Sequence, residues 1–267
     1  MTAFDMAAIK CNCDEFFTLY NVTKAGTLEM CQRKMEHTQR VAENCMYIAK
    51  HMGLNEYDCA LAWTIGELHD FARFGQAVAT KTFVDSERFN HARLGARLLF
   101  THRMIDDIIT NYDEISDADK IVMEKAVYHH SDYALPEGLT ERERLFCVII
   151  RDADKADIFR TSACGSWETT CAHSKEEIMN SDISPEFVAA FREHRTANNK
   201  KRTLPADFHV AHIALCFGLE TDAARRLTIE QGYLPRLVNS IEFTREDTRK
   251  KFAAMKAEVN KFIKKTA

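Results

Sequence analysis

Glycine and proline are both scarce in this sequence, which has nine glycines and four prolines among 267 residues. Sandwiches, barrels and disordered chains need more turn and loop residues, so this scarcity favours a mostly helical fold. No run reaches the roughly 18 uncharged apolar residues that a membrane-spanning helix requires. Residues 1–17 carry acidic groups and lack an apolar export segment. We therefore expect no membrane partner.

An excess of positive charge is also absent. The chain has 36 Lys and Arg against 40 Asp and Glu, a formal net charge of −4, so we expect no nucleic-acid partner. The nine cysteines are an odd number and form no Cys-x-x-Cys pair, which argues against a disulfide framework and a zinc knuckle. They are interpreted as reduced thiols in a cytoplasmic protein.

What the sequence does contain is helical periodicity along almost its whole length. The pattern predicts helices over residues 33–52, 56–71, 89–104, 118–130, 141–160 and 244–265. Asn55 with Asp58, and Thr140 with Glu143, have the spacing of helix caps. In helix 89–104 we expect Leu94 and Leu98 to point inward, and in helix 33–52 we expect the same of Met52.

The pattern loosens beyond residue 165. We therefore expect an all-α fold in which residues 1–165 form the functional core and residues 166–267 form a helical extension packed on it as one unit. Residues 72–90 are the longest non-periodic connection inside the core, and we interpret them as a lid or a specificity loop.

Histidines fall on the inward faces of four of these helices. His37 lies four residues before Val41, His69 lies four after Ile65, and His91 precedes Leu94 by three. The pair His129 and His130 follows Ala126 by three and four residues. Since residues three and four apart share a helix face, the four helices aim imidazoles at a common interior. Buried imidazoles and carboxylates need partners, and a metal ion supplies them.

Two acidic positions belong to the same constellation. Asp70 directly follows His69, and adjacent helical side chains diverge by about 100°, so both can bind one ion only near a helix end or where the ion sits between them. The two oxygens of Asp70 also allow it to bridge two ions. Further along, periodicity does not choose between Asp152 and Asp154, because their helix is apolar on nearly every side.

These residues, taken in order, resemble the HD superfamily of metal-dependent phosphohydrolases. Four stretches carry the resemblance over about residues 37–160: Leu68-His69-Asp70-Phe71-Ala72-Arg73-Phe74, Asn90-His91-Ala92-Arg93-Leu94-Gly95-Ala96, Tyr128-His129-His130, and Asp152-Ala153-Asp154-Lys155-Ala156-Asp157. The resemblance implies an HD-type helical bundle, and it selects Asp154 over Asp152 as the last ligand.

The resemblance also implies one or two divalent ions. His37, His69, Asp70 and Asp154 would hold the first, and His91 with His129 (or His130) would hold a second that Asp70 bridges. These nitrogen and oxygen ligands suit Mn²⁺, Fe²⁺, Co²⁺, Ni²⁺ or Mg²⁺.

The implied reaction is hydrolysis of a phosphate ester, with a small phosphomonoester or nucleotide as substrate. Arg73 lies one helical turn beyond Asp70 and Lys155 adjoins Asp154, so both are candidates for holding phosphate charge. Of the pair His129 and His130, one is a candidate ligand and the other, assigned here as His130, a candidate proton donor.

Two alternatives remain open at this point. Some members of the superfamily use the same ligands to hold two irons for oxidative cleavage with O₂, and a non-catalytic module would only bind a nucleotide. Elsewhere, His209-x-x-His212 resembles half a metal site but has no carboxylate at suitable spacing, so we expect plain core or surface histidines there.

Overall fold

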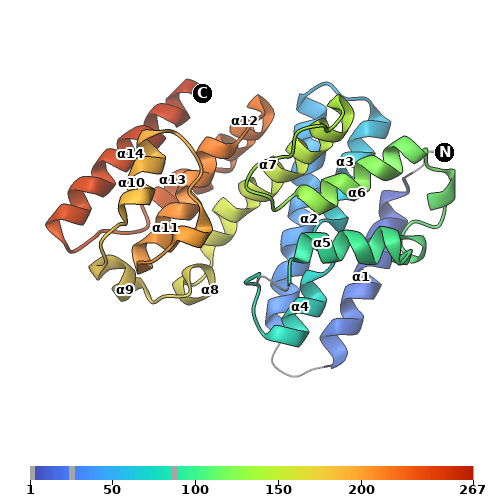
Figure 1. The fold of residues 1–267 in the computed structure, drawn as a ribbon, viewed down its shortest axis with the longest axis horizontal. Coiled ribbons are helices and arrows are strands. Elements are labelled where there is room, and N and C mark those ends of the chain that lie inside the picture. The colour runs from blue at the N-terminus through green and yellow to red at the C-terminus, as the bar shows by residue number, and fades with distance from the viewer. Residues whose placement is uncertain (1–3, 24–27, 86–88, 267) are drawn as a thin grey trace. The chain divides into compact units, whose positions relative to one another are not determined.

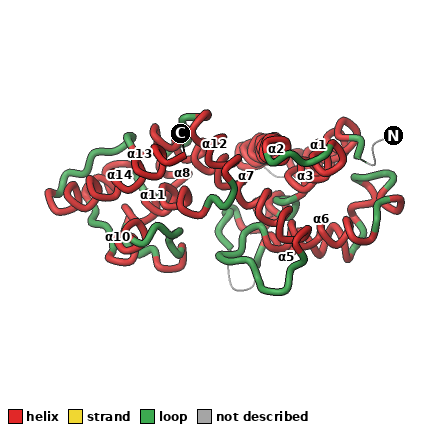
Figure 2. Tube along the Cα trace, turned by 90° about the horizontal axis from the view of Figure 1, so that it is seen from above, coloured by secondary structure: helices red, strands yellow, loops and turns green. Residues whose placement is uncertain are grey.

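The computed structural model describes residues 4–23, 28–85 and 89–266. Within these ranges every regular element is a helix, as Figures 1 and 2 show, which confirms the predicted all-α class. The helices are α1 (Met6–Thr23), α2 (Leu28–His51), α3 (Glu56–Leu68), α4 (Arg73–Thr80), α5 (His91–Ala96), α6 (Asp117–His129), α7 (Glu141–Cys164), α8 (Trp167–Cys171), α9 (Lys175–Asn180), α10 (Pro185–Arg192), α11 (Pro205–Ala214), α12 (Asp222–Gln231), α13 (Tyr233–Val238) and α14 (Glu246–Thr266).

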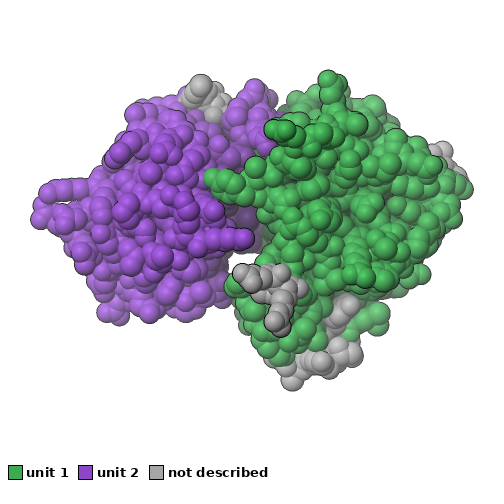
Figure 3. Space-filling model, viewed as in Figure 1, with its two compact units in different colours: residues 1–153 green, residues 154–267 purple. Residues whose placement is uncertain are grey.

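The chain divides into two compact units, residues 1–153 and 154–267, which Figure 3 colours separately. The division falls inside α7, which is one continuous helix. The sequence predicted a boundary at residue 165, directly after the end of α7 at Cys164, and this boundary stays a prediction.

In the first unit, α2 and α3 pack against each other more closely than any other pair of helices. Gly66 makes this possible, because a Cβ at that position would lie 2.5 Å from the Cα of Ala42 on α2. Any larger residue would push the two helices apart. The close crossing matters because α2 carries His37, and α3 ends directly before His69 and Asp70.

The predicted helix caps are confirmed. The Asn55 side chain accepts a hydrogen bond from the backbone N–H of Asp58 at the start of α3. At the start of α7, the Glu143 carboxylate accepts from the N–H of Thr140, and the Thr140 hydroxyl accepts from the N–H of Glu143. These interactions satisfy N–H groups that the first turn of a helix leaves without partners.

Three local expectations were wrong. The predicted connection 72–90 contains the helix α4, whose eight residues are too few to show a clear period, while residues 86–88 lie outside the described part. Leu94 and Leu98 are only half-buried, because α5 passes into a π-helical turn over Arg97–Thr101 that shifts the inward face to Leu99. Met52 is exposed, because α2 has already ended at His51.

The second unit is built around α11, which contacts α8, α9, α10 and α13. The long helix α14 packs on α10 and α12 and buries Phe252, Met255 and Val259, as its apolar stripe predicted. None of the described helices combines the length and the apolar character that crossing a bilayer needs.

Candidate metal centre

The pair His69-Asp70 lies just past a helix end, which is one arrangement that lets both side chains bind a single ion. The last residue of α3 is Leu68, and His69 is its C-cap. The Nδ1–H of His69 donates to the carbonyl of Gly66 at 2.7 Å, one of the carbonyls that a helix C-terminus leaves without an intrahelical partner. His130 repeats the arrangement as the C-cap of α6, donating from Nδ1 to the carbonyl of Val127 at 2.7 Å.

Asp70 is the centre of the cluster, and its two carboxylate oxygens face different groups of imidazoles. Oδ2 lies 3.6 Å from Nε2 of His37 and 3.3 Å from Nε2 of His69. Oδ1 lies 3.4 Å from Nε2 of His91 and 3.8 Å from Nε2 of His130. The four imidazoles come from separate parts of the chain and are all buried. The carboxylate therefore separates two neighbouring half-sites.

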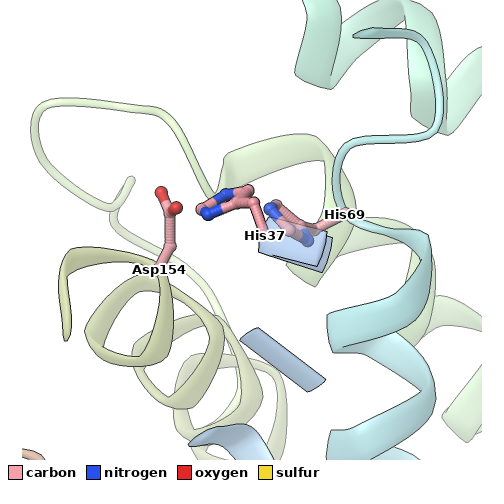
Figure 4. A group of neighbouring side chains, drawn as sticks. All are labelled: His37, His69 and Asp154. Atoms are coloured by element: carbon pink, nitrogen blue, oxygen red, sulfur yellow. The ribbon is translucent and has the colours of Figure 1, made fainter. Parts of the chain in front are cut away.

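The first half-site also contains Asp154. His37, His69 and Asp154 each offer one ligand atom, and these atoms lie within 4.8 Å of one another (Figure 4). Asp154 directly follows Ala153 in the continuous helix α7. A second group with the same spacing consists of His69, Asp70 and His130.

Two of the imidazoles turn Nε2 toward the centre. In His69 and His130 the Nδ1 atom faces a backbone carbonyl and donates its proton there, so Nε2 is the ring atom that can offer a lone pair to a cation. Among the described residues, no hydrogen-bond donor reaches the buried Nε2 of His69. Such an atom, beside a carboxylate, is what a divalent cation with nitrogen and oxygen preference requires.

His91 also turns its Nε2 atom toward the centre of the cluster. Its Nδ1 lies 2.7 Å from the Asp85 carboxylate, and its Nε2 lies 2.9 Å from Nε2 of His130. Burial lowers the pKa of His91, although the hydrogen bond to Asp85 opposes this, so the ring is neutral at pH 7. Two neutral imidazoles that both hold their protons on Nδ1 repel at this distance, unless a cation lies between their lone pairs.

Two cations flank the carboxylate, one on each oxygen. The Lys34 ammonium contacts Oδ2 of Asp70, and Nε of Arg73 lies 3.4 Å from Oδ1. Burial alone would raise the pKa of Asp70, but Lys34, His69 and Arg73 outweigh burial and hold that pKa well below its usual range. Both cations also lie against the ring of Phe83, at 5.5 and 5.9 Å from its centroid.

Lys34 is the site residue that the sequence analysis missed. It lies on α2, three residues before His37 and therefore on the same face of the helix. That spacing was a usable signal, but a lysine on a helix is usually solvated, and only the fold shows that its side chain turns toward Asp70.

The structure assigns the paired histidines to different places. His130 is buried and belongs to a metal-like group with His69 and Asp70, whereas the sequence analysis named His129 first and left His130 as the other candidate ligand. His129 is half-buried, and its Nδ1 lies 2.8 Å from the carboxylate of Asp132. His130 at a helix end can donate to a carbonyl of its own helix, which turns Nε2 inward.

Lys155 is buried in the second unit, where its Cε would lie 3.4 Å from a Cβ on Gly218. Its predicted role in holding phosphate stays a prediction. Asp152 is fully buried on the same helix and belongs to neither metal-like group, unlike Asp154.

The second unit has a different pair of histidines. His209 is buried, and its ring lies 5.0 Å from that of Trp167, while Nδ1 of His212 lies 3.0 Å from the hydroxyl of Ser162. Neither belongs to a metal-like group among the described residues. Two surface grooves of about 450 and 240 Å³ lie along α14 and share no residue with the cluster around Asp70.

The comparison with protein families agrees with this geometry. Residues 35–158 match the model of the HD domain, a range that includes every residue of the cluster except Lys34. Searches of curated proteins and of solved structures found no match to this chain. The ordered histidines and aspartates and the helical bundle agree with this match: residues 35–158, just under half of the chain, are similar to the HD domain.

Proposed function

We propose that this protein is a metal-dependent phosphohydrolase that cleaves a small phosphomonoester or a nucleotide. The observation that carries the proposal is the Asp70 carboxylate, which lies between two groups of imidazole lone pairs. Phosphoryl transfer needs charge neutralisation and an activated water more than it needs covalent chemistry, and a pair of ion sites sharing one carboxylate suits that need.

The two half-sites provide ligands for two ions. His37, His69, Asp154 and Oδ2 of Asp70 would hold one ion, and His91, His130 and Oδ1 of Asp70 would hold the other. Mn²⁺, Fe²⁺, Co²⁺, Ni²⁺ and Mg²⁺ all accept this set of nitrogen and oxygen atoms. When bound, such ions supply Lewis acidity toward phosphate oxygens and lower the pKa of a coordinated water.

The remaining residues have roles that follow from their charge. Lys34 and Arg73 flank the carboxylate and are proposed to bind the phosphate oxygens of the substrate. His129 takes the role of proton donor to the leaving oxygen, because Asp132 accepts from Nδ1 and so leaves Nε2 to exchange a proton. This exchanges the roles that the sequence analysis gave to His129 and His130.

The test is a panel of phosphate esters assayed with each of the five metals, using the wild type and the His69→Ala and His212→Ala variants. The proposal expects metal-dependent release of phosphate by the wild type, loss of that activity in His69→Ala and retention in His212→Ala. Anaerobically purified protein that shows a mixed-valent diiron signal by electron paramagnetic resonance, without phosphatase activity, would favour the oxygenase alternative. Binding of nucleotide without turnover by either reaction would favour the non-catalytic module.

We also infer a cytoplasmic location. The nine cysteines form no disulfide in the described structure, and seven of them are buried. A protein with many thiols and no disulfide suits a reducing compartment.

A further inference from the structure

We propose that Asp85 is a positioning residue that holds His91 in the tautomer needed for the second half-site. This inference rests on the proposed function, since it concerns how one ligand of that site is oriented. Asp85 lies at the end of the segment that follows α4, six residues before His91. Its Oδ2 lies 2.7 Å from Nδ1 of His91.

The reason that His91 needs an outside partner is its position in a helix. His69 and His130 each stand at a helix C-terminus, where carbonyls without partners accept the proton on Nδ1. His91 is instead the first residue of α5, with Asn90 as the N-cap. A helix N-terminus presents N–H groups and no spare carbonyl, so another part of the chain must supply the acceptor.

A carboxylate is well suited to this place. The N-terminus of α5 carries the positive end of the helix dipole, which favours a negative charge beside it. Burial would raise the pKa of Asp85, but the hydrogen bond from His91 and the positive charge of Arg73 outweigh burial and lower it. Asp85 is therefore ionised at neutral pH, and it accepts the Nδ1 proton of His91 in a charge-assisted hydrogen bond.

Asp85 is itself held in place from α4. Its other oxygen, Oδ1, lies 3.1 Å from a guanidinium nitrogen of Arg73 and 3.3 Å from the amide nitrogen of Gln76. Gln76 also donates to the carbonyl of Val84 at 3.1 Å, and Arg73 donates to the carbonyl of Phe83. The segment 83–85 is thus fastened to α4 at three consecutive residues, so the carboxylate is held rigidly.

The consequence reaches the centre of the site. With its proton fixed on Nδ1, the ring of His91 turns a lone pair at Nε2 toward Oδ1 of Asp70, 3.4 Å away, and toward Nε2 of His130. With the proton on Nε2 instead, the ring would offer no lone pair at that position and would not bind a cation there. Carboxylates that fix a ligand histidine in this way usually change metal affinity by about 10- to 100-fold.

The experiment compares the wild type with Asp85→Ala, with Asp106→Ala as the matched control. Asp106 is an exposed aspartate of the same unit that pairs only with Arg103 in the described contacts, so its loss should leave the site alone. Asp85→Leu, which keeps side-chain bulk but has no acceptor, serves if Asp85→Ala does not fold. The tautomer of His91 is measured in metal-free protein by long-range ¹H–¹⁵N spectra, with the signals assigned from a His91→Gln variant. Binding of Mn²⁺ and Co²⁺ is measured by calorimetry.

The inference expects the Nδ1–H form of His91 in the wild type and in Asp106→Ala, and a shift toward Nε2–H in the Asp85 variants. It also expects the second ion to bind about 10- to 100-fold more weakly in those variants, with the affinity of the first ion unchanged. An unchanged tautomer together with unchanged affinity for the second ion would overturn it. A wild type that binds no divalent ion would refute the proposed function instead, and the tautomer measurement would still decide whether Asp85 orients His91.

Discussion

The two units of this protein both bury histidines, but only one group has the features of a metal site. In the first unit, four imidazoles surround the carboxylate of Asp70. In the second, His209 and His212 lie one helical turn apart on α11, and the charged side chains that add to the effect of burial on their pKa values are the cations Lys256 and Arg202. Burial lowers the pKa of His209 to about 3 and that of His212 to about 4, with further contributions from nearby cations.

This difference shows that a buried histidine is weak evidence for a ligand by itself. Both groups consist of buried imidazoles inside helical units. What distinguishes the first is an ionised carboxylate at the point where the lone pairs meet, which turns the repulsion between them into a place for a cation. The second pair lacks the acid, so its histidines are core residues that must stay neutral.

Removing the shared carboxylate should have the largest effect. Asp70→Ala leaves both half-sites without their common oxygen ligand, so we expect loss of all bound divalent ions and a fall in kcat/KM of about 1,000-fold or more, roughly 4 kcal/mol of transition-state stabilisation. Metal content is measured by mass spectrometry of purified protein, and activity with the best substrate of the panel.

The matched control for this change is Asp207→Ala, which removes a fully buried aspartate of the second unit. Asp207 accepts hydrogen bonds from the backbone N–H of Leu204 at the start of α11 and from that of Ser184 at the start of α10, so its loss should lower stability and not metal content. A metal content in Asp70→Ala equal to that of the wild type would contradict the shared-ligand arrangement.

Removing one histidine from each group should separate the two units directly. His91→Ala takes a ligand from only one half-site, so one ion of two should be lost and kcat should fall by about 100-fold. His212→Ala removes a histidine from the second unit and should keep both ions. If His91→Ala binds as many metal ions per chain as the wild type, the centre holds one ion and His91 has only a structural role.

Much of this site was predictable from the sequence, for physical reasons. Helical periodicity places side chains on faces, so the histidines could be assigned to a common interior without knowing how the helices pack. The divergence of adjacent helical side chains made a helix end beside His69 and Asp70 one of two possible arrangements, and α3 ends at Leu68, three residues before the predicted end at Phe71. The family resemblance added the order of the motifs, which the family match over residues 35–158 bears out.

The rest depended on tertiary contacts that no local pattern encodes. Helix α6 ends at His129, one residue before the predicted end, and this makes His130 the C-cap whose Nδ1 reaches a carbonyl. Helix ends are the feature that a sequence predicts least well. Asp85 belongs to a segment without periodicity, so nothing tied it to His91 before the fold was known. Lys34 lies three residues before His37 on the same helix, but a charged side chain on a helix usually faces solvent.

The second unit should be the more sensitive of the two to acid. The folded state keeps His209 neutral down to about pH 3, whereas the unfolded chain takes up a proton below about pH 6.5. The stabilisation is complete above pH 6.5 and is lost as the pH falls from 6.5 toward 3, at about 1.4 kcal/mol per pH unit. At pH 5 the free energy of unfolding should therefore be about 2 kcal/mol lower than at pH 6.5 or above because of His209.

Urea denaturation of the wild type and of His209→Leu at pH 7 and pH 5 measures this cost. The wild type should lose about 2 kcal/mol more than the variant on going from pH 7 to pH 5. The buried His209 has no hydrogen-bond partner on Nε2 in the described structure, so leucine removes the titration without breaking a bond at that atom. Equal pH dependence in the two proteins would mean that His209 is protonated, or exposed to water, in the folded state.

The smallest effect is expected from replacing Lys34, the cation beside Asp70 that the sequence analysis missed. Lys34→Gln removes a positive charge beside Asp70 but no proposed metal ligand, so we expect both ions to bind and KM for a phosphate ester to rise about tenfold, roughly 1.4 kcal/mol. Lys10→Gln, on the partly exposed side of α1 where the lysine pairs with Asp14, is the control and should leave KM unchanged.

This comparison separates two roles that one contact allows. If Lys34 serves the substrate, its loss weakens binding of the phosphate and leaves the metal affinity as it was. If the ammonium instead only neutralises Asp70 in the absence of metal, its loss should tighten metal binding, because the cation no longer competes for Oδ2, and KM should not change. Calorimetry with Mn²⁺ and steady-state kinetics on the same variant decide between the two roles, because the first changes only KM and the second changes only the metal affinity.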